Sequence, residues 1–127
     1  MIHDVLATIG SEHQPRFRAF LAAPQEPADV LERELDAYVE MLRHMSTRIR
    51  AVDFGLVQKV AHVCRTLLHL PELTTEGSAL TNAAVRYFLR KEEDYDETTA
   101  VLSFHDDVEI LNAVSRSIDR QDLVIRP

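Results

Sequence analysis

Carboxylates crowd into one short stretch of this sequence, between positions 92 and 97. Such a cluster could hold Ca²⁺ or Mg²⁺, since both ions take oxygen ligands. A calcium loop that began at Asp94 would need glycine at its sixth position and glutamate at its twelfth, but the chain has Thr99 and His105 there. We therefore interpret the run as a solvated acidic loop or as a surface that meets a basic protein partner. It comprises Glu92, Glu93, Asp94, Asp96 and Glu97.

A His-Asp pair at His105 and Asp106 is the second group that could do chemistry. It resembles the pair of the HD phosphohydrolases, all-α enzymes in which a His, a His-Asp pair and a distal Asp bind metal ions that activate water. However, Asp106 and Asp107 fall in the first turn of a predicted helix, where the helix dipole attracts carboxylates. We expect capping here, and a metal-dependent phosphohydrolase is the second hypothesis. Its further ligands would be His62 or His69 and Asp119 or Asp122.

The other reactive side chains form no familiar constellation. His62 and His69 are seven positions apart, about 10.5 Å along one helix, so they cannot share a metal ion. Cys64 falls on an apolar stripe, where a small core residue is more common than a nucleophile. The sequence has no glycine-rich phosphate loop, paired CxxC, HExxH or GxSxG motif. We therefore expect no catalytic residue, no bound metal and no cofactor.

The segment 28–52 must position much of the remaining charge. Its apolar residues recur at spacings of 4, 3, 4, 3, 4 and 3, which predicts a helix with one apolar seam. Acids fill its first half and bases its second, so two antiparallel copies would be complementary, and a homodimer through residues 28–52 is one interpretation. A single helix packed in its own core is the other, because its dipole favours the same order of charges. We expect Glu32, Asp36 and Glu40 to join the 92–97 run as the partner-binding surface. The seam consists of Leu31, Leu35, Tyr38, Leu42, Met45, Ile49 and Val52.

Helical periodicity continues through the rest of the chain and predicts an all-α fold. The stretch 53–70 carries two adjacent apolar stripes, which are typical of the central helix of a bundle. Further helices are expected over 78–91 and 104–119, and a short helical pair in the first 24 residues. The prediction is one helical domain over residues 1–127, a bundle of four main helices with a short N-terminal helical pair.

Three short runs stand out in the C-terminal third: Ala84-Val85-Arg86-Tyr87-Phe88, Phe104-His105-Asp106-Asp107 and Leu111-Asn112-Ala113-Val114. Together they resemble the YkvA-type bacterial domain of unknown function, over about residues 83–119. The resemblance implies a small bacterial helical protein, and it implies no reaction because the role of that family is not established. Many members have an apolar, proline-containing connection before the paired aspartates, whereas this chain has its acidic run there. Any membrane association that depends on that connection is therefore not carried over.

The same motif makes sense as a structural unit. Tyr87 and Phe88 would anchor one helix, while Asp106 and Asp107 would begin the next one. We expect Arg86 to pair with Asp106 or Asp107, because a half-buried arginine–carboxylate bridge would lock the two helices together.

Composition limits the class of protein. A chain of 127 residues with 46% hydrophobic residues and 1 Cys fits one folded domain without an internal disulfide. A formal net charge of −7 argues against general nucleic-acid binding, and no apolar run approaches the ~20 residues that cross a bilayer. No signal peptide is visible, so we expect a cytoplasmic location. The leading hypothesis is a small interaction, adaptor or regulatory protein with an acidic partner-binding surface.

Overall fold

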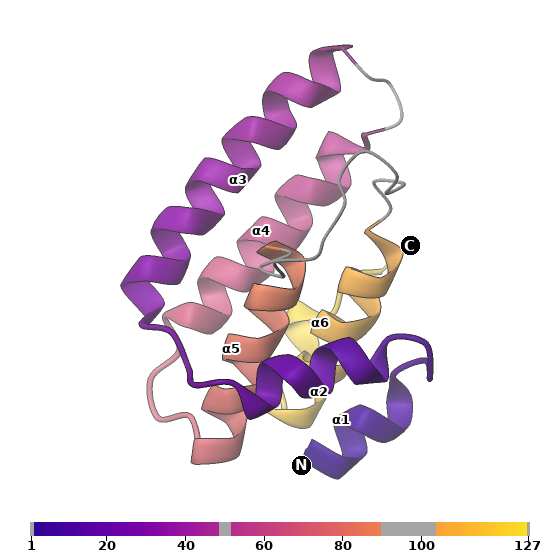
Figure 1. The fold of residues 1–127 in the computed structure, drawn as a ribbon, viewed down its shortest axis with the longest axis vertical. Helices are drawn as coiled ribbons and strands as arrows, with labels where there is room; N and C mark the ends of the chain where they lie inside the picture. Colours follow the sequence, from indigo (N-terminus) through magenta and orange to yellow (C-terminus); the bar gives the residue numbers. More distant parts are fainter. Residues whose placement is uncertain (1, 49–51, 90–103, 127) are drawn as a thin grey trace.

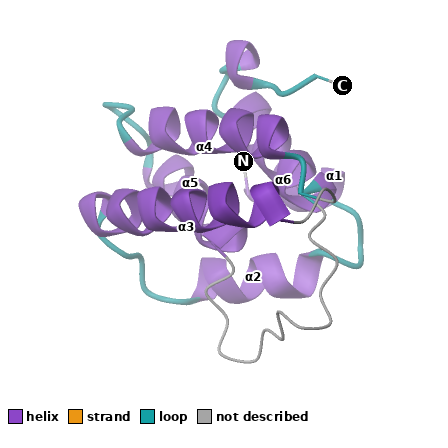
Figure 2. Cartoon of the chain, turned by 90° about the horizontal axis from the view of Figure 1, so that it is seen from above, coloured by secondary structure: helices purple, strands orange, loops and turns teal. Residues whose placement is uncertain are grey.

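The computed structural model describes residues 2–48, 52–89 and 104–126, and within these ranges every regular element is a helix (Figures 1 and 2). The all-α prediction is thus confirmed. None of the described helices is long and apolar enough to cross a membrane. The elements are α1 (Ile2–Thr8), α2 (Gln14–Ala22), α3 (Ala28–Arg48), α4 (Phe54–Leu68), α5 (Thr75–Leu89), α6 (His105–Ser117) and a 3-10 turn η1 (Gln121–Leu123).

Helices α3 and α4 form an antiparallel hairpin along one side of the molecule (Figure 1). The seam leucines Leu31, Leu35 and Leu42 are completely buried. Tyr38 meets Phe88 of α5 edge to face, with ring centroids 5.3 Å apart. The described part of the seam therefore packs inside the chain's own core, which was the second of the two interpretations. A homodimer through this helix would have to use its outer, charged side.

The most enclosed helix is α5. Every residue from Leu80 to Phe88 is buried, and α2, α3, α4 and α6 all pack against it. The central position therefore belongs to α5 and not to the predicted helix over 53–70, because α4 keeps a solvent-exposed side with Lys59 and His62. α5 also starts earlier than predicted, since the Thr74 hydroxyl accepts a hydrogen bond of 3.0 Å from the Gly77 N–H and caps its first turn.

The two N-terminal helices cover α5 and α6, with α2 along α5 and α1 against α6 (Figure 1). Phe17 and Phe20 of α2 are buried, and their ring centroids lie 6.5 and 6.4 Å from that of Tyr87. The Gln14 side-chain amide donates hydrogen bonds of 2.8 and 3.1 Å to two carbonyls at the end of α1. These bonds satisfy backbone acceptors that a helix end leaves open, and they fix the corner between α1 and α2.

After α6 the chain turns back over the bundle. Asp119 has a φ of 67°, and residues 122–126, which we call the C-terminal strap, then lie on α6 and α4. Asn112 of α6 donates to the Ile125 carbonyl at 3.0 Å and accepts from the Ile125 N–H at 2.8 Å. Leu123 of the strap is buried. The Asn112 side chain thus pairs with both backbone groups of Ile125, as a residue of a neighbouring β-strand would.

Candidate functional site

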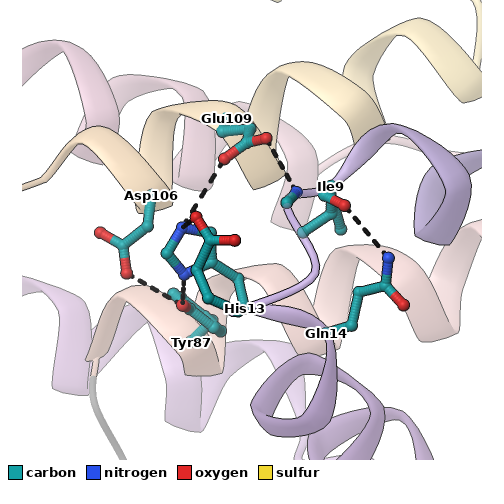
Figure 3. A network of polar contacts seen from close by, with 8 residues as sticks. Ile9, His13, Gln14, Tyr87, Asp106 and Glu109 are labelled. Carbon is teal, nitrogen blue, oxygen red and sulfur yellow. Dashed lines mark hydrogen bonds and ion pairs between the residues drawn. The ribbon is translucent and has the colours of Figure 1, made fainter.

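The motif residue Tyr87 stands at the centre of a polar cluster between α2, α5 and α6 (Figure 3). Its hydroxyl donates a hydrogen bond of 2.9 Å to Asp106 Oδ2. The Arg16 guanidinium lies over the Tyr87 ring, with Cζ 4.0 Å from the centroid, and Nη2 donates to the Tyr87 carbonyl at 3.2 Å. We call His13, Arg16, Tyr87, Asp106 and Glu109 the Tyr87 cluster. It joins three helices through side chains.

His13 brings the corner between α1 and α2 into this cluster. Its Nδ1 lies 3.5 Å from the Tyr87 hydroxyl, and its Nε2 lies 3.3 Å from Glu12 Oε1 and 3.8 Å from Glu109 Oε2. Glu109 also accepts a hydrogen bond of 3.0 Å from the Gly10 N–H. The dashed contacts in Figure 3 therefore run from the corner to both α5 and α6.

Two groups that could act as acids or nucleophiles are held in their protonated forms. Burial, and then the hydrogen bond to the Asp106 carboxylate, raise the pKa of Tyr87 well above its ordinary value. Burial raises the pKa of the Cys64 thiol, and the negative charge of Asp107 raises it further. Asp107 itself is 1% exposed, so the second carboxylate of the motif faces the interior and not solvent.

Arg86 holds the segment that links α2 to α3. Its Nη1 donates to the Phe20 carbonyl at 3.3 Å and to the Pro24 carbonyl at 3.2 Å, and its Nε lies 3.3 Å from Glu26 Oε2. Asn82, one turn earlier on α5, exchanges hydrogen bonds with the Glu26 backbone, donating at 2.8 Å and accepting at 3.2 Å. We call Asn82, Arg86 and Glu26 the linker clamp.

The predicted pairing of Arg86 with Asp106 or Asp107 is wrong. Successive residues of an α-helix point about 100° apart, so Arg86 faces the linker while Tyr87 faces α6. Asp106 therefore accepts its hydrogen bond from Tyr87, the residue next to Arg86. Phe88 takes its predicted role in the packing, because it is completely buried and its ring lies 6.0 Å from that of Phe104.

The two residues of the His-Asp pair face different surroundings. Asp106 belongs to the Tyr87 cluster, whereas the exposed His105 lines a surface groove with Asp53 and Lys59. Among the described residues, no three His, Cys, Asp or Glu side chains are grouped so that they could hold a metal ion. Both aspartates lie in the first turn of α6 as predicted, but the N-cap residue Phe104 makes no side-chain cap hydrogen bond, so the capping and the catalytic interpretations both stay predictions.

Three acids from the predicted partner-binding surface form a row along α3, which we call the acidic stripe: Glu32, Asp36 and Glu40. Each contacts a base, and these bases belong to α4, to the C-cap of α4 or to the next turn of α3. The predicted 92–97 run lies outside the described residues. The contacts are His69 Nε2 to Glu32 at 2.9 Å, Arg65 Nη2 to Asp36 at 2.7 Å, and Arg43 Nε and His44 Nε2 to Glu40 at 3.4 and 3.9 Å.

Comparison with protein-family models, curated proteins and solved structures finds no match to this chain, so the resemblance to the YkvA-type domain stays a prediction. His13, Glu109, Glu26 and Asn112 were not predicted as site residues, although Asn112 lies in the run from Leu111 to Val114. A signal existed for the linker clamp, since Ser78, Asn82 and Arg86 recur every four residues on an otherwise apolar helix.

Proposed function

We propose that this chain is a non-catalytic helical interaction module of the cytoplasm, which binds a protein partner with a basic surface through the acidic stripe of α3. The observation that supports the proposal is the order of the stripe. Glu32, Asp36 and Glu40 follow each other at intervals of four residues, and their side chains are 33%, 60% and 59% exposed. The row is about 12 Å long at the rise of an α-helix. In this proposal α3–α6 form the bundle and the short α1–α2 pair is attached to it.

The bases beside the acidic stripe contact its carboxylates but leave acceptor positions on them for a partner. Ion pairs between exposed side chains contribute only about 0–1 kcal/mol, and salt weakens them. A carboxylate has about four acceptor positions, so Asp36 can accept hydrogen bonds from a partner arginine while it keeps Arg65.

The absence of catalysis is part of the proposal and rests on the state of the reactive groups. Tyr87 and Cys64 keep their protons because burial raises the pKa of both. Asp106 is occupied by the Tyr87 hydroxyl, and His105 lies in a different environment.

Affinity capture from a cell lysate tests the stripe. The immobilised wild-type chain should retain a partner that a neutralised stripe variant does not retain, and raised salt should release it. A control with three other exposed acids neutralised should behave as the wild type. A partner that both variants retain equally would refute the proposal. The stripe variant is Glu32→Gln, Asp36→Asn and Glu40→Gln; the control is Asp4→Asn, Glu12→Gln and Glu72→Gln.

The partner could be a second copy of the chain, which offers a basic surface on the later part of α3. The later part of α3 carries Arg43, His44 and Arg48, so an antiparallel copy would place bases against the acidic stripe. Light scattering at high concentration and low salt should then give a dimer that the stripe variant does not form. A monomer under these conditions assigns the stripe to a different protein.

The phosphohydrolase hypothesis is tested by thermal unfolding with Mn²⁺, Mg²⁺ and Ca²⁺. A site-bound metal ion raises Tm by linkage. We expect no rise beyond the effect of ionic strength. A rise that His105→Ala or Asp106→Asn removes would replace the interaction module with the enzyme.

A further inference from the structure

The C-terminal strap divides a hollow on the surface between α4 and α6 into two lobes. The α6 lobe, of about 520 Å³, is bounded by α4, α6 and the strap. The α4 lobe, of about 870 Å³, lies on the α4 side of the strap. Gly55, Lys59, Ile125 and Arg126 line both lobes, so the two hollows meet at the strap. Each volume falls in the range of about 300–1,000 Å³ that is usual for small-molecule sites.

Apolar side chains form a large part of both linings. Leu56, Val108 and Ile125 contribute to the α6 lobe, and Val63 and Leu123 to the α4 lobe. The two hydrogen bonds between the Asn112 side chain and the Ile125 backbone, one donated and one accepted by Asn112, hold Ile125 where both lobes meet. An apolar ligand would therefore find preformed contacts that need little rearrangement of the strap.

Gly55 lines both lobes. It lies in the first turn of α4, where a glycine lowers helix stability by up to about 1 kcal/mol relative to alanine. No crowding requires it, because a Cβ at this position would meet only Asp53 Oδ1, at 3.5 Å. A larger side chain would instead extend into the hollow.

The hollow carries two cations without a carboxylate partner among the described residues, in contrast to the acidic balance of the chain. Lys59 and Arg126 line both lobes, and neither makes an ion pair within the described residues. Of the two acids in the linings, Asp122 is bound by Arg120 at 2.9 and 2.8 Å, and Asp53 accepts from the Leu56 N–H as the cap of α4. His62 in one lobe and His105 in the other add positive charge only when they are protonated.

We propose that this hollow binds a small amphiphilic anion, with an acyl or other apolar body on Ile125 and a carboxylate head between Lys59 and Arg126. The apolar lining supports this ligand class together with the two cations, which make no ion pair within the part of the chain that the structure describes. A partner helix is a poorer occupant, because Ile125 and Arg126 lie between the lobes and interrupt a continuous trough.

Titration with decanoate, below its micelle concentration, tests the proposal by amide chemical shifts. Decanoate should give saturable shifts at Gly55, Lys59, Ile125 and Arg126. Decanol, which has the same chain and no charge, and acetate, which has the head group alone, should bind at least about tenfold more weakly, in line with the loss of a charge-assisted contact.

Three variants and a matched control localise the site. Lys59→Glu and Arg126→Glu should each weaken decanoate binding by about two- to fivefold, the size expected of exposed charge contacts. Gly55→Leu should block decanoate binding, while the dispersion of the amide resonances shows that the variant is still folded. Arg116→Glu, at an exposed arginine beside another hollow, should leave binding unchanged.

Three results would overturn the proposal. Equal affinities for decanol and decanoate would show that Lys59 and Arg126 do not contribute to binding. Chemical shift changes that do not saturate would show that decanoate does not bind at a specific site. The same conclusion would follow if Arg116→Glu weakened binding as strongly as Lys59→Glu. Binding of a Glu-rich peptide or of anionic vesicles to the same residues, without any response to decanoate, would assign the hollow to a peptide or to a membrane surface.

Discussion

Replacement of Arg86 by methionine tests the linker clamp most severely. Methionine keeps much of the apolar stem of arginine but has no donor. The Phe20 and Pro24 carbonyls and the Glu26 carboxylate would each lose the contact that Arg86 provides. The Arg86 side chain is only 9% exposed and that of Glu26 29%, so water can replace these contacts only in part.

The size of the effect follows from these contacts. A hydrogen bond to a charged group contributes about 1.5–3 kcal/mol, and breaking a buried ion pair costs about 3–5 kcal/mol. Because the contacts share one guanidinium and Glu26 is partly exposed, their energies do not add, and we expect a loss of about 3 kcal/mol. For a chain of this length that corresponds to a fall in Tm of roughly 10 °C.

Urea unfolding followed by circular dichroism measures this loss, and a double-mutant cycle assigns it. Arg86→Met and Glu26→Gln should couple by about 1–2 kcal/mol, whereas Arg86→Met and Asp106→Asn should be additive within about 0.5 kcal/mol. A loss below about 1 kcal/mol, or coupling to Asp106 in place of Glu26, would refute the linker clamp.

Other features of the fold give independent expectations. Because the pKa of Tyr87 is raised in the folded chain, its stabilising effect is complete below the ordinary tyrosine value of about 10 and is lost as pH rises further; Tyr87→Phe should flatten the fall in unfolding free energy above that pH in alkaline urea titrations. Cys64, whose thiol pKa burial raises, should react with a disulfide reagent only on the timescale of unfolding; fast reaction in the native state would contradict its burial. Asn112→Ala should cost about 1–2 kcal/mol and open the strap to proteolysis, because both hydrogen bonds to Ile125 are lost; an unchanged cleavage pattern would show that Leu123 alone holds the strap.

Helix positions could be predicted because the apolar spacing matches the helical repeat. Leu31, Leu35 and Leu42 fall on one side of α3 at spacings of four and seven, and all are buried as that pattern requires. The central place of α5 could not be predicted in the same way. Its residues Asn82 and Arg86 are polar, and their burial depends on backbone acceptors of a linker that is distant in the sequence.

The candidate site shows the same division. Tyr87 and Asp106 could be singled out from the C-terminal motif, and the two do contact each other. Their other neighbours include His13 and Arg16 from the N-terminal part of the chain, and nothing local in the sequence brings these to α5. The charge pattern of α3 was clear, but its partners Arg65 and His69 depended on how α4 packs against it.

A charge swap across the α3–α4 hairpin tests the proposed interaction most directly. In the wild type, Arg65 Nη2 lies 2.7 Å from Asp36 Oδ1. The double variant Asp36→Arg and Arg65→Asp keeps an ion pair at this position but moves the negative charge from α3 to α4. We expect the swapped chain to unfold at the wild-type Tm within about 2 °C and to lose the partner that the wild type captures. A swapped chain that is equally stable and captures the same partner with unchanged affinity would contradict the role of the acidic stripe.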